Sequence, residues 1–208
     1  QVRALANGHP SIWCTQGIHP HEAESWCPAL AKRVENGAED ERVVAIGEIG
    51  LDRTYIDSEE EWNVQKQVFS KQLSLAEKYN KPVSIHSRKT LGDIFEILPS
   101  YKVPGILLHW FDGNKSQLRT AMDNQYFVSY GPLLVYANDK QTLLTKTDPS
   151  CLLVETDGPV KFSRCFEYKT TEIMFLPSVL FCASKLLHTT YEKLLVQIED
   201  NSKKFLGI

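Results

Sequence analysis

Short apolar runs alternate with amphipathic segments along the whole chain, and this alternation limits the folds that the chain can adopt. The run Val43–Ile46 is unbroken and rich in branched residues, which is typical of a strand buried on both faces. The order of strand and helix repeats six times and indicates a parallel sheet with helical crossovers. The predicted strands cover residues 11–17, 43–47, 82–85, 105–108, 126–130 and 151–155.

Helices are predicted between and after these strands. Ser58 with Glu61, and Thr189 with Glu192, have the spacing of a capping box at a helix N-terminus. The helix that follows Ser58 carries a broad apolar arc, so we expect it to cover a flat surface, as a helix on a sheet does. The predicted helices cover residues 28–36, 58–79, 91–98, 114–124 (with Asn114 or Ser116 as the cap), 140–147, 176–188 and 191–205.

The composition is that of an ordinary globular protein. The 208 residues are 42% hydrophobic and 24% charged, and no linker divides them, so residues 1–208 are interpreted as a single domain. The net charge of −3 excludes a broad basic surface. A polyanionic partner would therefore be held by local groups or through a bound metal ion.

The cysteines and the chain ends bear on the cellular compartment. The five cysteines form no CxxC pair and no zinc-ribbon spacing, so they are interpreted as reduced thiols of a cytoplasmic or nuclear protein. No apolar run approaches the roughly 18 residues of a transmembrane helix, and no signal peptide is recognisable, so no membrane partner is expected. The segment Gln1–Gly8 has the pattern of the end of a helix, and we expect that residues upstream of it are missing.

Histidines and carboxylates follow the predicted strands where these strands end. Catalytic groups of parallel sheets gather at this edge. Neutral imidazoles and carboxylates together are ligands for a divalent cation. Glu48 could bridge two ions, with His86 and His109 on one, and Asp157 could hold the other ion or take a proton from water. The strand-end residues are His19, His21, Glu48, His86, His109 and Asp157.

Each of these residues also has a simpler interpretation. Glu48 could face the solvent after a glycine turn, and a histidine at a strand end could be hydrogen-bonded within a loop. Asp157 precedes a Gly-Pro pair, which is a strong turn signal. The recurrence of the pattern at several strand ends favours the metal site. His9 and His188 lack this placement and are interpreted as structural or solvated residues.

A series of motifs resembles, in order, those of the TatD family of metal-dependent deoxyribonucleases. The resemblance covers nearly the whole chain, and GEIGLD together with ETDGP is its most specific part. It implies a TIM-type (β/α) barrel that hydrolyses DNA phosphodiester bonds with divalent ions, two in number, of Mg²⁺, Mn²⁺ or Zn²⁺. The matching segments are GIHPH at 17–21, IGEIGLD at 46–52, IHSR at 85–88, LHWFDG at 108–113, VETDGP at 154–159 and NSKKFLG at 201–207.

The resemblance also implies roles for single residues. Glu48 would be a catalytic residue and the metal ligand shared by both ions. His86 and His109 would bind one ion and Asp157 the other, with Asp157 also acting as the base. An arginine offers a planar fork of donors to phosphate oxygens. The residues expected at the substrate phosphate are His19, His21 and Arg88.

The chain departs from the family pattern in three places. The family barrel has eight strands and six are predicted here, so the expected fold is an N-terminally incomplete barrel. The His-x-His pair that ends the first strand in many members has no counterpart upstream of His19. Trp110 stands where the family has Cys or His, and the loop Lys161–Glu172 is divergent, which leaves the substrate preference open.

These observations predict a metal-dependent deoxyribonuclease, with 3′–5′ exonuclease action on DNA. One alternative is a hydrolase of another ester or of an amide, because related barrels host many chemistries. Another alternative is a catalytically impaired fragment or a metal-binding scaffold, because two strands of the family pattern are missing. Nucleic-acid binding without catalysis is disfavoured, because the chain has no zinc-finger pattern and no dense basic stripe.

Overall fold

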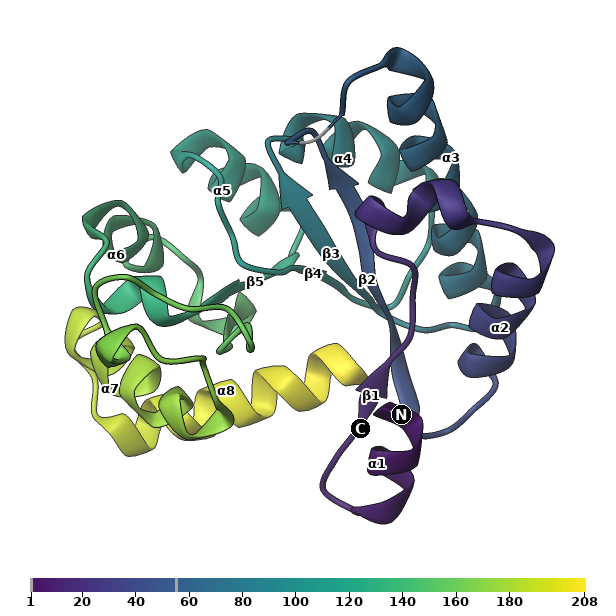
Figure 1. The fold of residues 1–208 in the computed structure, drawn as a ribbon. Coiled ribbons are helices and arrows are strands. Elements are labelled where there is room, and N and C mark those ends of the chain that lie inside the picture. Colours follow the sequence, from purple (N-terminus) through teal and green to yellow (C-terminus); the bar gives the residue numbers. More distant parts are fainter. Residues whose placement is uncertain (1, 55) are drawn as a thin grey trace. The chain divides into compact units, whose positions relative to one another are not determined.

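The structure of the protein is a computed structural model that describes residues 2–54 and 56–208. Strands and helices alternate along the chain, from α1 (Val2–Gly8) to α8 (Tyr191–Leu206) (Figure 1). The residues form two compact units, each of which is described by itself. Unit 1 extends to Leu107 and includes Phe205–Ile208, and unit 2 comprises Leu108–Lys204.

Unit 1 is built on three parallel strands that lie side by side in chain order. These are β1 (Cys14–Thr15), β2 (Val43–Asp52) and β3 (Val83–Arg88). Nine of the ten residues of β2 are buried, and Glu48 is the partly exposed one. A register shift between Ile46 and Ile49 allows β2 to continue along β3 to Asp52, so the strand is longer than the predicted 43–47.

Gly50 allows the close approach of β2 to β3 at the point where the site is formed. Its φ is 140°, and a Cβ placed there would lie 2.1 Å from the carbonyl oxygen of His86. Only glycine fits this position without moving the backbone. The register pairs Gly50 with His86 and Asp52 with Arg88, which brings the predicted strand-end residues of β2 and β3 to the same edge.

Several helices of unit 1 pack against its strands. Helix α3 (Glu59–Lys78) packs against β2 and against α2 (Pro28–Ala38) (Figure 1). The predicted cap at Ser58 is confirmed, since its hydroxyl accepts from the Glu61 backbone amide at 3.2 Å. In a capping box the Glu61 carboxylate would accept from the Ser58 backbone amide. Here it accepts from Asp57 N instead. The remaining helices are α1, α4 (Leu91–Ile97) and the 3₁₀ segments η1 (Pro20–Ser25) and η2 (Leu98–Ser100).

Two buried glutamines of α3 hold the backbone segments that carry the site. Gln72 accepts from Ile18 N at 2.7 Å and donates to Ile18 O at 3.0 Å, directly before His19. Gln65 accepts from Asp52 N at 3.0 Å. Buried polar backbone groups need such partners. The apolar arc of α3 predicted its buried face but gave no reason to place these glutamines on it.

Replacing Gln72 by alanine is expected to lower the free energy of unfolding by about 1–3 kcal/mol, because two buried backbone groups of Ile18 lose their partners. Gln67→Ala, on the exposed face of the same helix, is the matched control and should change it by less than about 0.5 kcal/mol. Urea unfolding of both variants measures the difference. Equal stabilities would show that Gln72 does not hold this segment.

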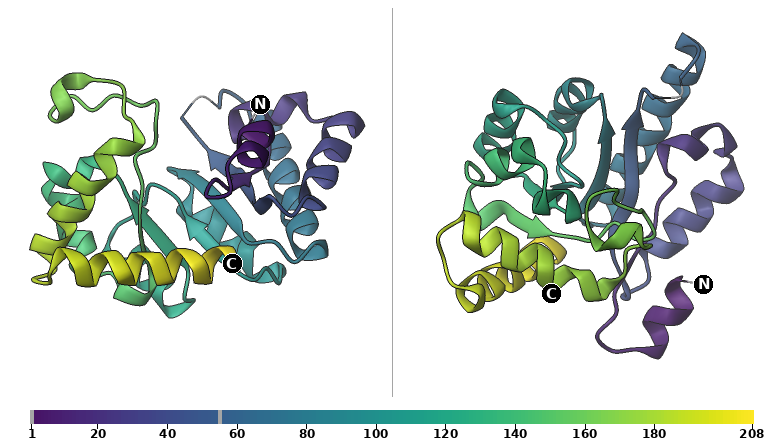
Figure 2. Two further views of the ribbon diagram at one scale, coloured as in Figure 1. Left: turned by 90° about the horizontal axis from the view of Figure 1, so that it is seen from below. Right: turned by 60° about the vertical axis from the view of Figure 1, so that its left-hand side comes forward.

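Unit 2 contains two paired parallel strands with helices around them. Strand β5 (Phe127–Tyr130) pairs with β6 (Leu152–Val154), with Ser129 opposite Leu153. Asn201 of α8 donates to Pro149 O at 2.7 Å and to Leu152 O at 2.8 Å. Helix α8 runs uninterrupted toward the C-terminus (Figure 2). The other elements are β4 (Ile106–Leu108, at the division between the units), α5 (Lys115–Asp123), η3 (Pro132–Val135), α6 (Asn138–Leu144), η4 (Pro149–Cys151), η5 (Phe166–Tyr168), η6 (Ile173–Phe175) and α7 (Leu176–Leu186).

Several predicted boundaries need correction. The strand predicted at 11–17 has regular pairing only at Cys14–Thr15, because its register with β2 shifts there. Asn114, and not Ser116, caps α5 in a complete capping box. The hydroxyl of Thr190, and not that of the predicted cap Thr189, accepts from Lys193 N in the first turn of α8. Thr189 belongs to the turn that closes α7, where its backbone amide donates to Ser184 O.

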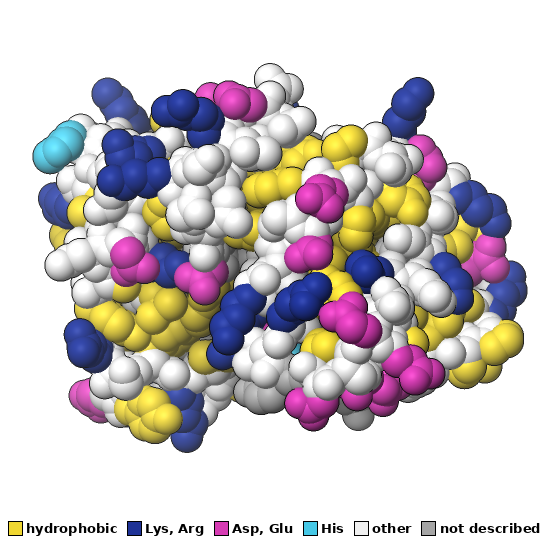
Figure 3. Space-filling view, turned by 90° about the horizontal axis from the view of Figure 1, so that it is seen from above, with side chains coloured by type: hydrophobic (Ala, Val, Ile, Leu, Met, Phe, Trp, Pro, Cys, Tyr) yellow, Lys and Arg dark blue, Asp and Glu magenta, His cyan; other side chains and the backbone are white. Residues whose placement is uncertain are grey.

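Two surface properties bear on partners. On the face drawn in Figure 3, Lys and Arg side chains are scattered among Asp and Glu side chains and form no continuous basic field. Among the described residues no single helix has the length and apolar composition to cross a membrane. The helical segments Ile173–Leu186 and Tyr191–Leu206 meet these two criteria only when they are taken together, and the chain bends by 111° between them.

Candidate metal centre

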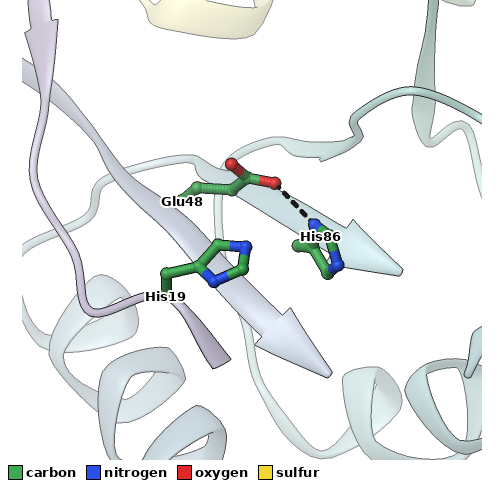
Figure 4. A group of neighbouring side chains, drawn as sticks. All are labelled: His19, Glu48 and His86. Atoms are coloured by element: carbon green, nitrogen blue, oxygen red, sulfur yellow. Dashed lines mark hydrogen bonds and ion pairs between the residues drawn. The ribbon is translucent and has the colours of Figure 1, made fainter. Parts of the chain in front are cut away.

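Three side chains from consecutive segments of unit 1 converge on one point. His19 follows β1, Glu48 lies on β2 and His86 lies on β3 (Figure 4). One potential ligand atom from each lies within 4.8 Å of the other two. Two imidazoles and a carboxylate are a donor set that binds divalent transition metals. This donor set therefore fits the divalent cation that the sequence predicts, and it includes His19, which was expected at the substrate phosphate.

The imidazole of His19 is oriented by the backbone that follows it. Its Nδ1 accepts from His21 N at 3.2 Å at the start of η1, which places the proton of the neutral imidazole on Nε2. Its ring also packs edge to face on the ring of His86, with centroids 4.6 Å apart. These two contacts fix the orientation of the ring, and binding of a metal ion through Nε2 would require the proton to move to Nδ1 and the hydrogen bond from His21 N to be released.

Asp52 holds two imidazoles of the site in place. Its side chain is fully buried, and one carboxylate oxygen lies 2.8 Å from His21 Nε2 and 2.9 Å from His86 Nε2. Burial would raise the pKa of Asp52, but hydrogen bonds from Thr54, His86 and His21 outweigh it and lower the pKa to about 2. Asp52 is thus an ionised carboxylate that orients the histidines. Asp52 closes the IGEIGLD motif, but the sequence pattern alone did not indicate this role.

The protonation states of the two cluster histidines differ. Burial lowers the pKa of His19, and the positive charge of His86 lowers it further, to about 4. Burial opposes the charged form of His86 as well, but hydrogen bonds to Glu48 (3.0 Å) and Asp52 raise its pKa above the ordinary value. Without metal, His19 is therefore neutral at neutral pH, and His86 is the imidazole that gains a proton more easily.

Metal binding is expected to release a proton from His86, because both of its ring nitrogens meet carboxylates and a metal ion needs one of them unprotonated. The metal affinity should consequently fall as the pH falls through the raised pKa of His86, while His19 stays neutral down to about pH 4. NMR titration of the imidazole nitrogens measures both midpoints in metal-free protein. A His19 midpoint above that of His86 would contradict this assignment.

Unit 2 contains a second group of strand-end residues. His109 Nδ1 lies 2.6 Å from a carboxylate oxygen of Glu155, which also accepts from Ser129 Oγ at 2.8 Å. His109 Nε2 lies 3.5 Å from Asp157 Oδ1. The other Glu155 oxygen, Oε1, is buried and has no hydrogen-bond partner among the described residues. A buried carboxylate oxygen in this condition is costly unless a cation or a donor meets it, so this group also fits a metal ion.

The predicted site residues thus fall into two groups of contacts. In unit 1, Glu48 and His86 contact each other, and His19 and His21 lie beside them. Arg88 is exposed at the end of β3, opposite Asp52 in the register. In unit 2, His109 and Asp157 are brought together. The residues that the sequence analysis missed are the orienting carboxylates Asp52 and Glu155, the hydroxyl of Ser129, and the glutamines Gln65 and Gln72.

A protein-family model and several named proteins are similar in sequence to most of this chain. The family model described as TatD-related DNase matches residues 1–207. The 3′-5′ ssDNA/RNA exonuclease TatD of Klebsiella pneumoniae is 30% identical over an alignment of 219 positions that covers 100% of this chain and 82% of that protein. The uncharacterized metal-dependent hydrolase YabD of Bacillus subtilis is 28% identical, over 95% of this chain and 78% of that one.

Solved structures show the same fold. The crystal structure of YjjV, a TatD homologue from Escherichia coli K12, superimposes with a TM-score of 0.91 at 24% identity, over 100% of this chain and 81% of that chain. A TatD-family hydrolase from Entamoeba histolytica gives a TM-score of 0.77 at 19% identity, over 93% and 74% of the two chains. The predicted α/β fold of the TIM-barrel type, with six strands, is confirmed. The chain belongs to the TatD-related DNase family and is a hydrolase that acts on ester bonds.

Proposed function

We propose that this chain is a divalent-metal-dependent deoxyribonuclease that removes nucleotides from the 3′ end of single-stranded DNA. The observation that carries the proposal is the convergence of His19, Glu48 and His86 on one point. The name of the Klebsiella relative, a 3′-5′ exonuclease of single-stranded DNA and RNA, supports the polarity and the unpaired substrate. The name of the Bacillus relative supports the dependence on metal.

Both groups of strand-end residues are assigned to metal binding. His19, Glu48 and His86 would hold one cation, with Asp52 fixing the imidazole of His86. His109 and Asp157 would be the ligands in unit 2, with Glu155 in the same orienting role. A bound divalent cation would supply a Lewis acid for the phosphate and lower the pKa of a water molecule.

The protein's own residues would position the phosphate and move the proton. Arg88 lies on the same face of β3 as His86, two residues away, and forms no ion pair with any residue that the structure describes. Its guanidinium is therefore available for two parallel hydrogen bonds to a phosphate. His21, held by Asp52 at 2.8 Å, would be a second phosphate ligand. Asp157 would take the proton of the attacking water.

The test is the release of nucleotides from oligonucleotides carrying a fluorophore at the 5′ end. We expect a ladder that shortens from the 3′ end in Mg²⁺ or Mn²⁺ and stops with EDTA, and slower cleavage of duplex DNA. Internal cuts without a ladder would contradict the exonuclease polarity. The alternative, a hydrolase of another ester or of an amide, is tested with a panel of phosphodiesters, carboxyl esters, lactones and amides, because a barrel of this type does not fix the substrate. Turnover of one of these compounds with no cleavage of DNA would favour this alternative.

A further inference from the structure

A large apolar groove lies in unit 2, on the loop that the sequence analysis found divergent. Its volume is about 730 Å³, within the range of ligand pockets. It is walled by η3, by the loop that follows Asp157, by α7 and by the start of α8. We call it the Arg164 groove, and the lining residues used here are Val135, Arg164, Phe166, Phe181 and Tyr191.

The charge of the Arg164 groove is positive. Among the described residues that line it, Arg164 is the one charged side chain and none is acidic. Its guanidinium lies over the ring of Tyr136, 6.0 Å from the centroid, and forms no ion pair with any residue that the structure describes. The nearby Glu167 is neutralised by Lys169 at 2.6 Å. An unpaired arginine above an apolar floor favours an anionic ligand with flat apolar parts.

Aromatic rings form much of the remaining wall. Phe181 is 54% exposed, and Lys185 Nζ lies 4.9 Å from the centroid of its ring. Phe166 is stacked on Phe175, with centroids 4.1 Å apart and ring planes 7° from parallel. Exposed rings with cations beside them are the elements with which proteins bind unpaired nucleic-acid strands.

The wall of the Arg164 groove is linked through the polypeptide backbone to the group around His109. Its loop begins directly after Asp157, and the thiol of Cys165 lies 3.8 Å from Pro132 O. The neighbouring Gly131 packs against Glu155, where a Cβ would lie 3.5 Å from Glu155 Cγ. The wall of the groove is therefore joined through two residues to the carboxylate that orients His109.

We propose that the Arg164 groove binds nucleotides of an unpaired strand beyond the one being cleaved, with bases stacked on Phe181 and Phe166 and a phosphate on Arg164. This inference rests on the proposed function and deepens it. Stacking requires bases that are free of a complementary strand, so the groove would select single-stranded substrates. It also gives the divergent loop a role, since the loop contributes Arg164 and Phe166.

The test compares affinities for fluorescein-labelled oligothymidylates of increasing length, measured by anisotropy in EDTA. We expect the wild-type affinity to rise with length. Arg164→Ala and Phe181→Ala should each weaken binding of the longest oligomer by about tenfold, because the first removes a phosphate contact and the second removes a ring on which a base stacks. Binding of a dinucleotide and hydrolysis of bis(p-nitrophenyl) phosphate in Mn²⁺ should not change. Arg164→Lys should bind with intermediate affinity, and Arg119→Ala, an exposed arginine on α5, is the control.

The outcomes separate this inference from the proposed function. If the wild type binds long oligomers through the groove but cleaves none, the nuclease proposal fails and the inference stands. If DNA is cleaved and the length dependence is the same in both variants, the inference is overturned. No binding of any oligomer overturns it as well. A concentration-dependent dimer that Phe181→Ala dissociates, with DNA binding unchanged, would assign the groove to a second copy of the chain and overturn it.

Discussion

Replacing Glu48 by glutamine is expected to reduce the hydrolysis of single-stranded DNA by about a thousandfold or more. Glu48 is the carboxylate of the cluster with His19 and His86, so the change removes the negative charge that would hold the cation. Metal-ion catalysis supplies several kcal/mol of transition-state stabilisation, and each 1.36 kcal/mol is about tenfold in rate. Glutamine keeps the size of the side chain, which separates the loss of the ligand from a loss of packing.

Initial rates in Mn²⁺ and the metal affinity by calorimetry measure this effect together. Both should fall in Glu48→Gln, while the thermal unfolding of metal-free protein should change little, because Glu48 is the partly exposed residue of β2. Glu41→Gln, at an exposed position just before the same strand, is the control for the charge change. Wild-type rates in Glu48→Gln would rule out the metal-ligand role of this residue.

Replacing Asp157 by asparagine is expected to lower kcat by about a hundredfold to a thousandfold and to leave KM for DNA nearly unchanged. The carboxylate lies beside His109 Nε2 and is the proposed base, and general acid–base catalysis contributes about 10²–10⁴-fold. Asp157 has a φ of 51°, a conformation that asparagine also adopts readily, so the turn before Gly158 should be kept.

This substitution also tests the simpler interpretation of Asp157 as a turn residue. In that case Asp157→Asn would be fully active, and any larger substitution would lower stability without a specific effect on kcat. Asp123→Asn, an exposed residue at the end of α5, is the control. Steady-state kinetics with a labelled oligonucleotide, together with urea unfolding, distinguish the two interpretations.

Strand order predicted the contact between Glu48 and His86, which lie on two paired strands. Parallel strands place their carboxyl ends on one edge, and this was enough to predict that Glu48 and His86 are neighbours, as their 3.0 Å contact confirms. The capped helix after Ser58 followed from local signals in the same way. These features depend on residues that are close in sequence or on a rule of topology.

The missed residues depend on register and on packing between distant segments. Asp52 orients His21 and His86 only because β2 continues past Gly50 along β3, and the predicted strand ended at Gly47. Gln72 acts through the backbone of Ile18, 54 residues away. Hydrophobic patterns describe which face of an element is buried, but not which buried polar group meets which backbone atom, so such contacts need the structure.

The most direct test of the account is a crystal structure of the protein grown with Mn²⁺, with the anomalous signal of the metal measured. We predict an anomalous peak about 2.0–2.3 Å from the Glu48 carboxylate and from the imidazole nitrogens of His19 and His86. Well-ordered side chains at these three residues with no peak between them, at a Mn²⁺ concentration that supports hydrolysis, would contradict the metal centre and the proposed function with it.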